Sequence, residues 1–243
     1  MNNTIGICIP TFNESSNIIK LLDKLIKIKN VIVCVVDDNS PDKTYELLIR
    51  KYSKNLNKKI FVIKRKKKDG RGSAVWIGFR KLKTLKVSTY VEMDSDFSHS
   101  IYDLKKGLKI FSKKNEEIDV LLGSRYPNGK IINWPIERRI FSKLANILAR
   151  FLISDKIHDY TNGFRFYNSY AVKIMVKKKP KNKGYVYLIE TLSEFIDKKL
   201  RIIEYDIVFK NRIRGKSNTT LNEILNSLKG IFSIAFNFYF KKF

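Results

Sequence analysis

Two aspartates, Asp94 and Asp96, stand two positions apart directly after an apolar run, and this pair is the clearest chemical feature of the sequence. Two carboxylates at the end of a buried strand are costly unless a positive charge lies between them. A divalent cation supplies that charge, because Mg²⁺ is commonly held by one or two carboxylates together with substrate phosphates. Such a pair on its own is also typical of a solvated loop start, so its meaning depends on what accompanies it.

Acidic residues also follow two earlier apolar runs. Asp37 and Asp38 follow the run 31–36, and Glu14 lies just beyond the run 4–10. Segments with helical periodicity separate these runs, and this alternation predicts βαβ units with a parallel sheet. Ligands bind at the carboxyl edge of such sheets. The sequence therefore predicts one crevice built from residues 10–14, 37–38 and 94–96.

The same alternation predicts an α/β fold with a mainly parallel central sheet flanked by helices. Apolar runs predict the strands, and apolar residues at helical spacing predict the helices. The expected strands are 4–10, 31–36, 60–63, 89–93, 119–123, 163–167 and 202–209. The expected helices follow residues 13–15 and 41–42 and cover 74–82, 137–153, 188–198 and the tail from 220.

The charge of the chain is strongly positive: 49 Lys and Arg against 23 Asp and Glu give a net charge of +26 over 243 residues. Nucleic acid, an anionic membrane surface and a phosphate-bearing substrate are the partners that such a charge fits. A lysine excess is also what A+T-rich codon usage produces. The lysines are scattered and no nucleic-acid-binding module is recognisable, so a nucleic-acid-binding protein is the distant alternative.

Two basic amphipathic segments, 137–153 and 220–243, have the composition of helices that lie in a membrane surface. No run of about 20 apolar residues is long enough to span a bilayer, and no leader segment is expected. We therefore expect a peripheral or monotopic protein on the cytoplasmic face of a membrane. The alternative is that both helices simply pack on the rest of the chain. Cys8 and Cys34 lie inside apolar runs and are expected to be buried thiols.

The succession of motifs resembles the inverting GT-A-fold glycosyltransferases of family 2, and within them the polyprenol-phosphate (dolichol-phosphate) mannosyltransferases. The resemblance covers nearly the whole chain. The motifs are residues 9–14 (IPTFNE), 36–42 (VDDNSPD), 93–99 (MDSDFSH), 123–126 (GSRY), 134–135 with Arg138 and Ser142, 160–165 (YTNGFR), 184–190, 209–212 and 215–217.

This resemblance implies an enzyme that moves mannose from GDP-mannose to a dolichyl or undecaprenyl phosphate, with Mg²⁺ or Mn²⁺ as cofactor. A UDP-sugar donor such as UDP-glucose is the alternative within the same fold. It also implies a GT-A catalytic domain over 1–219, an acceptor and interface helix within 131–153, and a membrane-associating helix at 220–243. A small membrane-anchoring subunit is a further partner that some relatives use.

The resemblance also assigns roles to residues at matching positions. The donor-binding positions are Pro10, Phe12, Glu14, Val36, Asp38, Asp94, Ser95 and Arg212. The metal positions are Asp94, Asp96 and Ser98, and the acceptor-phosphate positions are Arg125, Arg138 and Ser142. Asp96, Arg125 and Arg138 are the residues expected to be catalytic.

Two positions depart from the family pattern. Ser98 stands where a metal-binding Gln is frequent, and Asn218 stands where the donor loop usually has a Lys, so that Lys216 or Arg214 would have to supply the charge. A phosphate acceptor, with a second pKa near 6, is already ionised near neutral pH and needs no strong general base. His99 is therefore expected to order the metal loop.

Overall fold

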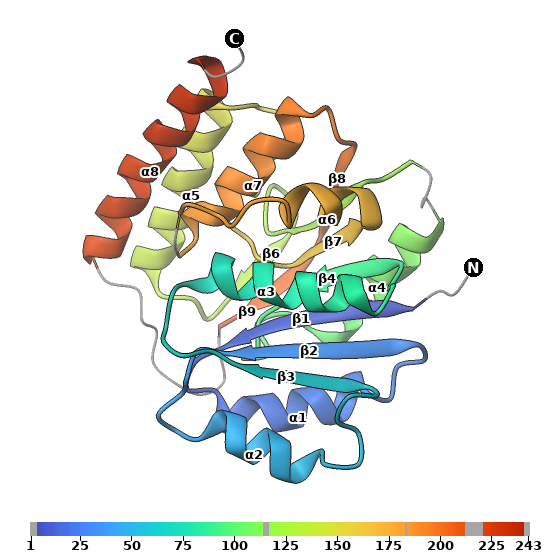
Figure 1. Cartoon of the computed structure of the whole chain (residues 1–243). Coiled ribbons are helices and arrows are strands. Elements are labelled where there is room, and N and C mark those ends of the chain that lie inside the picture. The colour runs from blue at the N-terminus through green and yellow to red at the C-terminus, as the bar shows by residue number, and fades with distance from the viewer. Residues whose placement is uncertain (1–3, 114–116, 183, 212–220, 241–243) are drawn as a thin grey trace.

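The computed structural model describes residues 4–113, 117–182, 184–211 and 221–240 of the chain (Figure 1). Its centre is a seven-stranded sheet with the order β3-β2-β1-β4-β7-β5-β8. These strands are β1 (Ile5–Thr11), β2 (Val31–Asp37), β3 (Ile60–Lys64), β4 (Thr89–Glu92), β5 (Val120–Ser124), β7 (Arg165–Asn168) and β8 (Ile202–Asp206).

Helices cover both faces of this sheet, because its strands are apolar on both sides. Along β1 the side chains alternate: Ile7 and Ile9 enter one hydrophobic cluster and Cys8 enters the other. One face is covered by α1 (Ser15–Leu25), α2 (Thr44–Lys51) and α4 (Ile101–Lys113). The other face is covered by α3 (Arg71–Thr84), α6 (Ser169–Met175) and α7 (Val186–Asp197).

The parallel strands end together, which is the feature that builds the site. In the register of the sheet, Thr11 lies opposite Asp37 and Asp37 lies opposite Lys64. β4 pairs in parallel with β1, and β8 in parallel with β5, whereas β7 runs antiparallel to both of its neighbours. The mainly parallel α/β sheet predicted from the sequence is thereby confirmed.

Three local predictions need correction. The segment 202–209, expected as one strand, leaves the main sheet at Ile207 and continues as β9 (Val208–Lys210), which pairs with β6 (Lys130–Ile132) in a separate ribbon. The break is fixed because the N–H of Ile207 still donates to Ser124 of β5, while its carbonyl accepts from Lys130. Helices α4 and α6 were not expected.

Two further helices, α5 (Ile136–Leu152) and α8 (Leu221–Phe240), lie side by side at one end of the molecule, where α8 also contacts α7 (Figure 1). Within the described part of α8, Ile231 and Ile234 are buried in this contact. No helix among the described residues is both long and apolar enough to cross a membrane. Cys8 and Cys34 are free and buried, as expected, and they lie opposite one another in the register of β1 and β2.

Candidate active site

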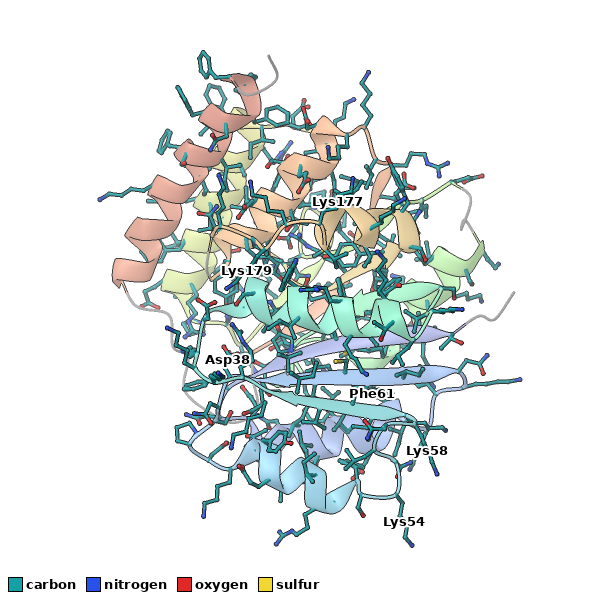
Figure 2. All side chains as sticks on the ribbon, viewed as in Figure 1. Asp38, Lys54, Lys58, Phe61, Lys177 and Lys179 are labelled. Atoms are coloured by element: carbon teal, nitrogen blue, oxygen red, sulfur yellow. The ribbon has the colours of Figure 1, made fainter. Side chains whose placement is uncertain are left out.

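Asp38, the first residue after β2, is held by a loop that follows β3. Arg65 donates to Asp38 Oδ1 at 2.6 Å, and the same guanidinium bonds the Gly70 carbonyl and Ser73 Oγ at the start of α3. Burial raises the pKa of the Asp38 carboxyl, and the Arg65 charge acts against that rise. The carboxyl end of β2 is therefore tied to the N-terminus of α3. Figure 2 shows Asp38 and Lys179 on the same side of the molecule, with Lys54 and Lys58 at the opposite end of the sheet.

Asp94, which follows β4, is also held by a residue at the N-terminus of α3. Arg71, the first residue of α3, donates through one terminal nitrogen to Asp94 Oδ1 and through Nε to Glu92 Oε1 at 3.0 Å. The N-terminus of α3 therefore connects the two acidic clusters, one through Arg65 and one through Arg71. The structure brings Asp38 and Asp94 to one edge of the sheet, as the sequence predicted.

His99 orders the loop that contains Asp94 and Asp96. The backbone N–H of Asp94 donates to His99 Nδ1 at 3.1 Å, so Nε2 bears the ring proton and donates to Asn162 Oδ1, also at 3.1 Å. The ring is buried and stacks on Phe164, and burial lowers the pKa of His99. Since both ring nitrogens have hydrogen-bond partners, the neutral His99 side chain holds the loop in place. Within this loop Asp96 is buried and accepts from the N–H of Ser98.

Arg125 lies at the end of β5 in a buried ion pair. Its guanidinium meets both carboxylate oxygens of Asp159 at 2.8 Å and donates to Thr161 Oγ1 at 2.7 Å. Burial raises the pKa of Asp159, but the Arg125 charge and hydrogen bonds outweigh burial, and the pKa is lowered overall. Thr161 in turn contacts Ser142 Oγ of α5 at 3.2 Å. Arg125 is only 4% exposed, and in this structure its guanidinium is engaged with Asp159 and Thr161.

The other predicted residues fall into three groups. Pro10, Phe12 and Glu14 are partly exposed at the end of β1, where Lys68 lies over the Phe12 ring and Glu14 accepts from Asn17. Val36 does not present its side chain at the sheet edge, because it is buried in the core beneath. Ser95, Ser98 and Ser142 are buried, Arg138 is partly buried on α5, and Arg212 lies outside the described residues.

Sequence reasoning missed four residues that build this framework: Arg65, Arg71, Glu92 and Asp159. Arg65 and Arg71 stand in a basic, glycine-containing loop at the predicted carboxyl edge, and that position was the available signal. Glu92 could have been noticed as a charge inside an apolar strand. Nothing local distinguishes Asp159 from a surface residue, because its partner is 34 residues away.

The described part of the chain supplies only some of the ligands that a hard divalent cation needs. Among the described residues, no three His, Cys, Asp or Glu side chains converge to hold an ion on their own. Asp94 and Asp96 offer two carboxylates on a loop fixed by His99. Two carboxylates are what a protein typically contributes when substrate phosphates and water complete the shell of Mg²⁺. The residues present therefore fit an ion that binds together with a phosphorylated substrate.

Comparison with known families decides the class of protein. Residues 6–175 match the family model described as glycosyl transferase family 2. The chain belongs to this family. It is therefore a glycosyltransferase, and the matched segment includes the loop of Asp94 and Asp96 together with α3 and Arg125.

Curated relatives match over most of the chain. Polyprenol monophosphomannose synthase of Mycolicibacterium smegmatis is 31% identical, over 91% of this chain and 83% of its own length. Undecaprenyl-phosphate mannosyltransferase of Micrococcus luteus is 30% identical, over 86% of this chain and 84% of its own length. Dolichol-phosphate mannosyltransferase of Pyrococcus furiosus is 30% identical over 95% of this chain, which spans only 63% of that longer relative.

Solved structures share the fold at lower identity. Glucosyl-3-phosphoglycerate synthase from Mycobacterium tuberculosis, in complex with Mn²⁺, UDP-glucose and phosphoglyceric acid, aligns with a TM-score of 0.68 and 17% identity. The alignment covers 97% of this chain and 79% of that one. The same enzyme in complex with Mg²⁺ and UDP gives a TM-score of 0.65. At this identity the likeness establishes the fold.

Proposed function

We propose that this glycosyltransferase moves mannose from GDP-mannose to the phosphate of a polyprenyl lipid, giving a polyprenyl phosphate mannose. The proposal rests on one structural observation: the helix that frames the acceptor side of the site, α5, is apolar on its outer surface and polar toward the site. The names of the three curated relatives, which all specify a mannosyl group and a polyprenyl, undecaprenyl or dolichol phosphate, support it.

Polar side chains of α5 point toward Asp159 and Thr161. Ser142 contacts Thr161, and Asn146 donates to Asp159 and accepts from the N–H of Tyr160. Its outer surface bears an unbroken apolar stripe at helical spacing. Exposed fractions along that stripe are Ile136 71%, Ile140 51%, Leu144 50%, Ile147 52% and Phe151 84%. Smaller and partly buried apolar residues of α5, among them Ala149 and Leu148, pack against the core, yet this stripe of large apolar side chains stays exposed. A contiguous exposed apolar stripe of this kind indicates a surface made for an apolar environment.

Helix α8 lies beside α5 and contacts it (Figure 1). It exposes four aromatic residues: Phe232 56%, Phe236 62%, Tyr239 52% and Phe240 66%. Arg139, Lys143 and Lys229 are exposed on the same two helices and suit anionic headgroups. We call this surface, formed by the exposed residues of α5 and α8, the apolar helix face, and we propose that it lies in the cytoplasmic face of a membrane. The C-terminal helix would then be the membrane-associating segment expected at 220–243.

On the donor side, Asp38, Phe12 and Glu14 would contact the nucleotide at the ends of β1 and β2, with Pro10 and Ser95 beside them. Arg212 is proposed to reach the donor phosphates. Asp94 and Asp96, with Ser98 nearby, would hold Mg²⁺ or Mn²⁺, which stabilises the negative charge of the leaving diphosphate. The Mn²⁺, Mg²⁺ and UDP-sugar complexes of the structural relative are consistent with this arrangement.

On the acceptor side, Arg138 and Ser142 of α5 are proposed to receive the lipid phosphate. Arg is suited to phosphate because its planar guanidinium forms paired charge-assisted hydrogen bonds. Arg125 supports these residues through Thr161, which contacts Ser142. Attack by one phosphate oxygen on the anomeric carbon requires no protein base near neutral pH, because the second pKa of a phosphate monoester is near 6. What the chain must supply is position and charge compensation between two anions.

A donor panel tests the proposal. The purified chain is incubated with undecaprenyl or dolichyl phosphate in mixed micelles, Mg²⁺ or Mn²⁺, and either GDP-mannose or UDP-glucose. Released nucleotide and glycolipid are both measured. We expect GDP release and a mannolipid only when lipid phosphate is present. If glycolipid forms only with UDP-glucose, the donor is the UDP-sugar alternative and the mannose assignment is wrong. If no glycolipid forms with either donor, the polyprenyl phosphate acceptor is refuted.

A further inference from the structure

Arg71 is placed between two carboxylates that the proposed chemistry treats differently. Its Nε donates to Glu92 Oε1 at 3.0 Å, and a terminal nitrogen lies 2.9 Å from the same oxygen. Its other terminal nitrogen donates to Asp94 Oδ1. Glu92 is inside the sheet with no exposed surface, whereas Asp94 is partly exposed at the sheet edge.

The guanidinium of Arg71 is fixed by its surroundings. Glu92 also accepts hydrogen bonds from the hydroxyls of Tyr167 and Tyr187, so its own position is set by three donors. A Cβ at Gly163 would lie 2.6 Å from the guanidinium, and one at Gly72 would lie 2.5 Å from the Tyr187 ring. The absence of a Cβ thus lets the backbone at Gly163 approach the Arg71 guanidinium, and the backbone at Gly72 approach the Tyr187 ring. Movement of the Arg71 side chain would therefore break its ion pair with the buried Glu92 carboxylate, which is costly.

A fixed guanidinium imposes a fixed orientation on Asp94. Oδ1 is directed at Arg71, and the backbone N–H of the same residue is bonded to His99. The carboxylate plane is therefore set before any ion arrives. The orientation of Asp94 matters because the neighbouring Ser98 offers only a hydroxyl. Partners of this kind, which hold a ligand in place, commonly change metal affinity about 10- to 100-fold.

We propose that Arg71 is a positioning residue: it aims the Asp94 carboxylate at the divalent ion and thereby sets the affinity of the site for that ion. The inference rests on the proposed function only in taking Asp94 as a ligand. Simple charge repulsion makes the opposite prediction, because a cation next to the site disfavours a second cation. Replacing Arg71 together with Glu92, which removes one charge of each sign, separates the effect of orientation from this repulsion.

The test measures Mn²⁺ binding directly by electron paramagnetic resonance of the free ion, with the full chain, in the presence and absence of GDP or UDP. The double variant Arg71→Met with Glu92→Gln removes one charge of each sign and so keeps the net charge. We expect its dissociation constant for Mn²⁺ to rise about 10- to 100-fold. Arg80→Met, an exposed arginine on the same helix, is the matched control and should bind as wild type.

Three further measurements separate the possible failures. Asp94→Asn should abolish the binding. If it binds Mn²⁺ like wild type, or if wild type does not bind at all, the metal site of the proposed function is wrong. If Asp94→Asn fails to bind while the double variant binds as tightly as wild type or more tightly, the positioning role is refuted. Should the double variant not fold, judged by circular dichroism, Arg71→Lys replaces it: this variant keeps the charge but loses the second contact, and unchanged affinity would refute the role.

Discussion

The apolar helix face makes a prediction that depends on a single exposed side chain. Phe151 keeps 84% of its surface exposed near the end of α5, so the folded chain gains little from it. Fully burying a phenylalanine is worth about 1.5–3 kcal/mol. Scaled by the exposed fraction, insertion of Phe151 into a bilayer contributes about 1.3–2.5 kcal/mol, which is roughly an 8- to 60-fold change in partition coefficient.

The perturbation is Phe151→Ser, and the assay is flotation with vesicles that contain anionic phospholipid. We expect the partition coefficient, obtained from the bound fraction over a series of lipid concentrations, to fall by that factor. The free energy of unfolding should stay within about 0.5 kcal/mol of wild type, because an exposed side chain is removed. Tyr102→Ser is the matched control. Tyr102 is 76% exposed, but it lies on α4, which covers the other face of the sheet.

The result that would refute the reasoning is specific. If Phe151→Ser floats like wild type, or if Tyr102→Ser loses as much binding, the apolar helix face does not contact the bilayer. Activity supplies a second readout. With a short-chain, water-soluble acceptor phosphate, both variants should be as active as wild type, because neither side chain belongs to the donor or acceptor site. A loss of activity on that acceptor would mean that Phe151 acts through the structure of α5.

Three other predictions concern the site. Asp96→Asn should lower kcat by about two to three orders of magnitude with an unchanged unfolding transition, since the metal contributes several kcal/mol of charge stabilisation; near wild-type turnover in Mg²⁺ would exclude the metal role. Arg125→Met leaves Asp159 buried and unpaired, so urea denaturation should show a loss of about 3–5 kcal/mol, and a stable but inactive protein would instead favour direct phosphate binding. The transfer rate should rise with pH with a midpoint near 6 and level off by about pH 7, following the acceptor phosphate; an inflection at higher pH that disappears in His99→Asn would refute the absence of a base.

The Arg125–Asp159 pair also has a pH dependence that follows from the lowered pKa of Asp159. A carboxyl whose pKa is lower in the folded state stabilises the fold above its unfolded pKa of about 3.9 and loses that contribution as pH falls below it. The pair is therefore fully stabilising in the range where the transfer rate would be measured. Loss of activity between pH 5 and 6 would thus report the acceptor phosphate and not this pair.

The parts of the fold that sequence predicted are those set by local composition. β1, β2 and β4 are short apolar runs because they are buried on both faces, and acidic residues directly after them mark the carboxyl edge. Helix α5 was recognised from its period. Which side of the helix turns inward was not predictable from the period alone, since that depends on the hydrogen bonds of Asn146 to Asp159 and between Ser142 and Thr161.

The contacts that sequence could not give are pairings between distant positions. Arg71 and Asp94 are 23 residues apart, and Arg125 and Asp159 are 34 apart. Both arginines stand at ends of elements whose relative placement only the folded sheet defines. Sequence identified Arg125 as a phosphate-binding residue because of its motif, whereas the structure shows a guanidinium already committed to a carboxylate and a hydroxyl. The motif identifies the type of side chain at position 125, but only the folded structure shows which groups that side chain binds.

One connected set of hydrogen bonds relates helix α5, on the proposed membrane side, to the loop that contains Asp94. Ser142 of α5 contacts Thr161, Thr161 and Asn162 are both held by Asp159, and Asn162 bonds His99, which fastens Asp94. All of these side chains except Asp94 are buried, so the path is shielded from water, and its hydrogen bonds are stronger than they would be in solvent. Under the proposed function, a lipid phosphate anchored at the bilayer surface can move along that surface but not in depth. Rigid placement of the Asp94 loop relative to α5 would then be the condition for the two anionic substrates to meet at a fixed height.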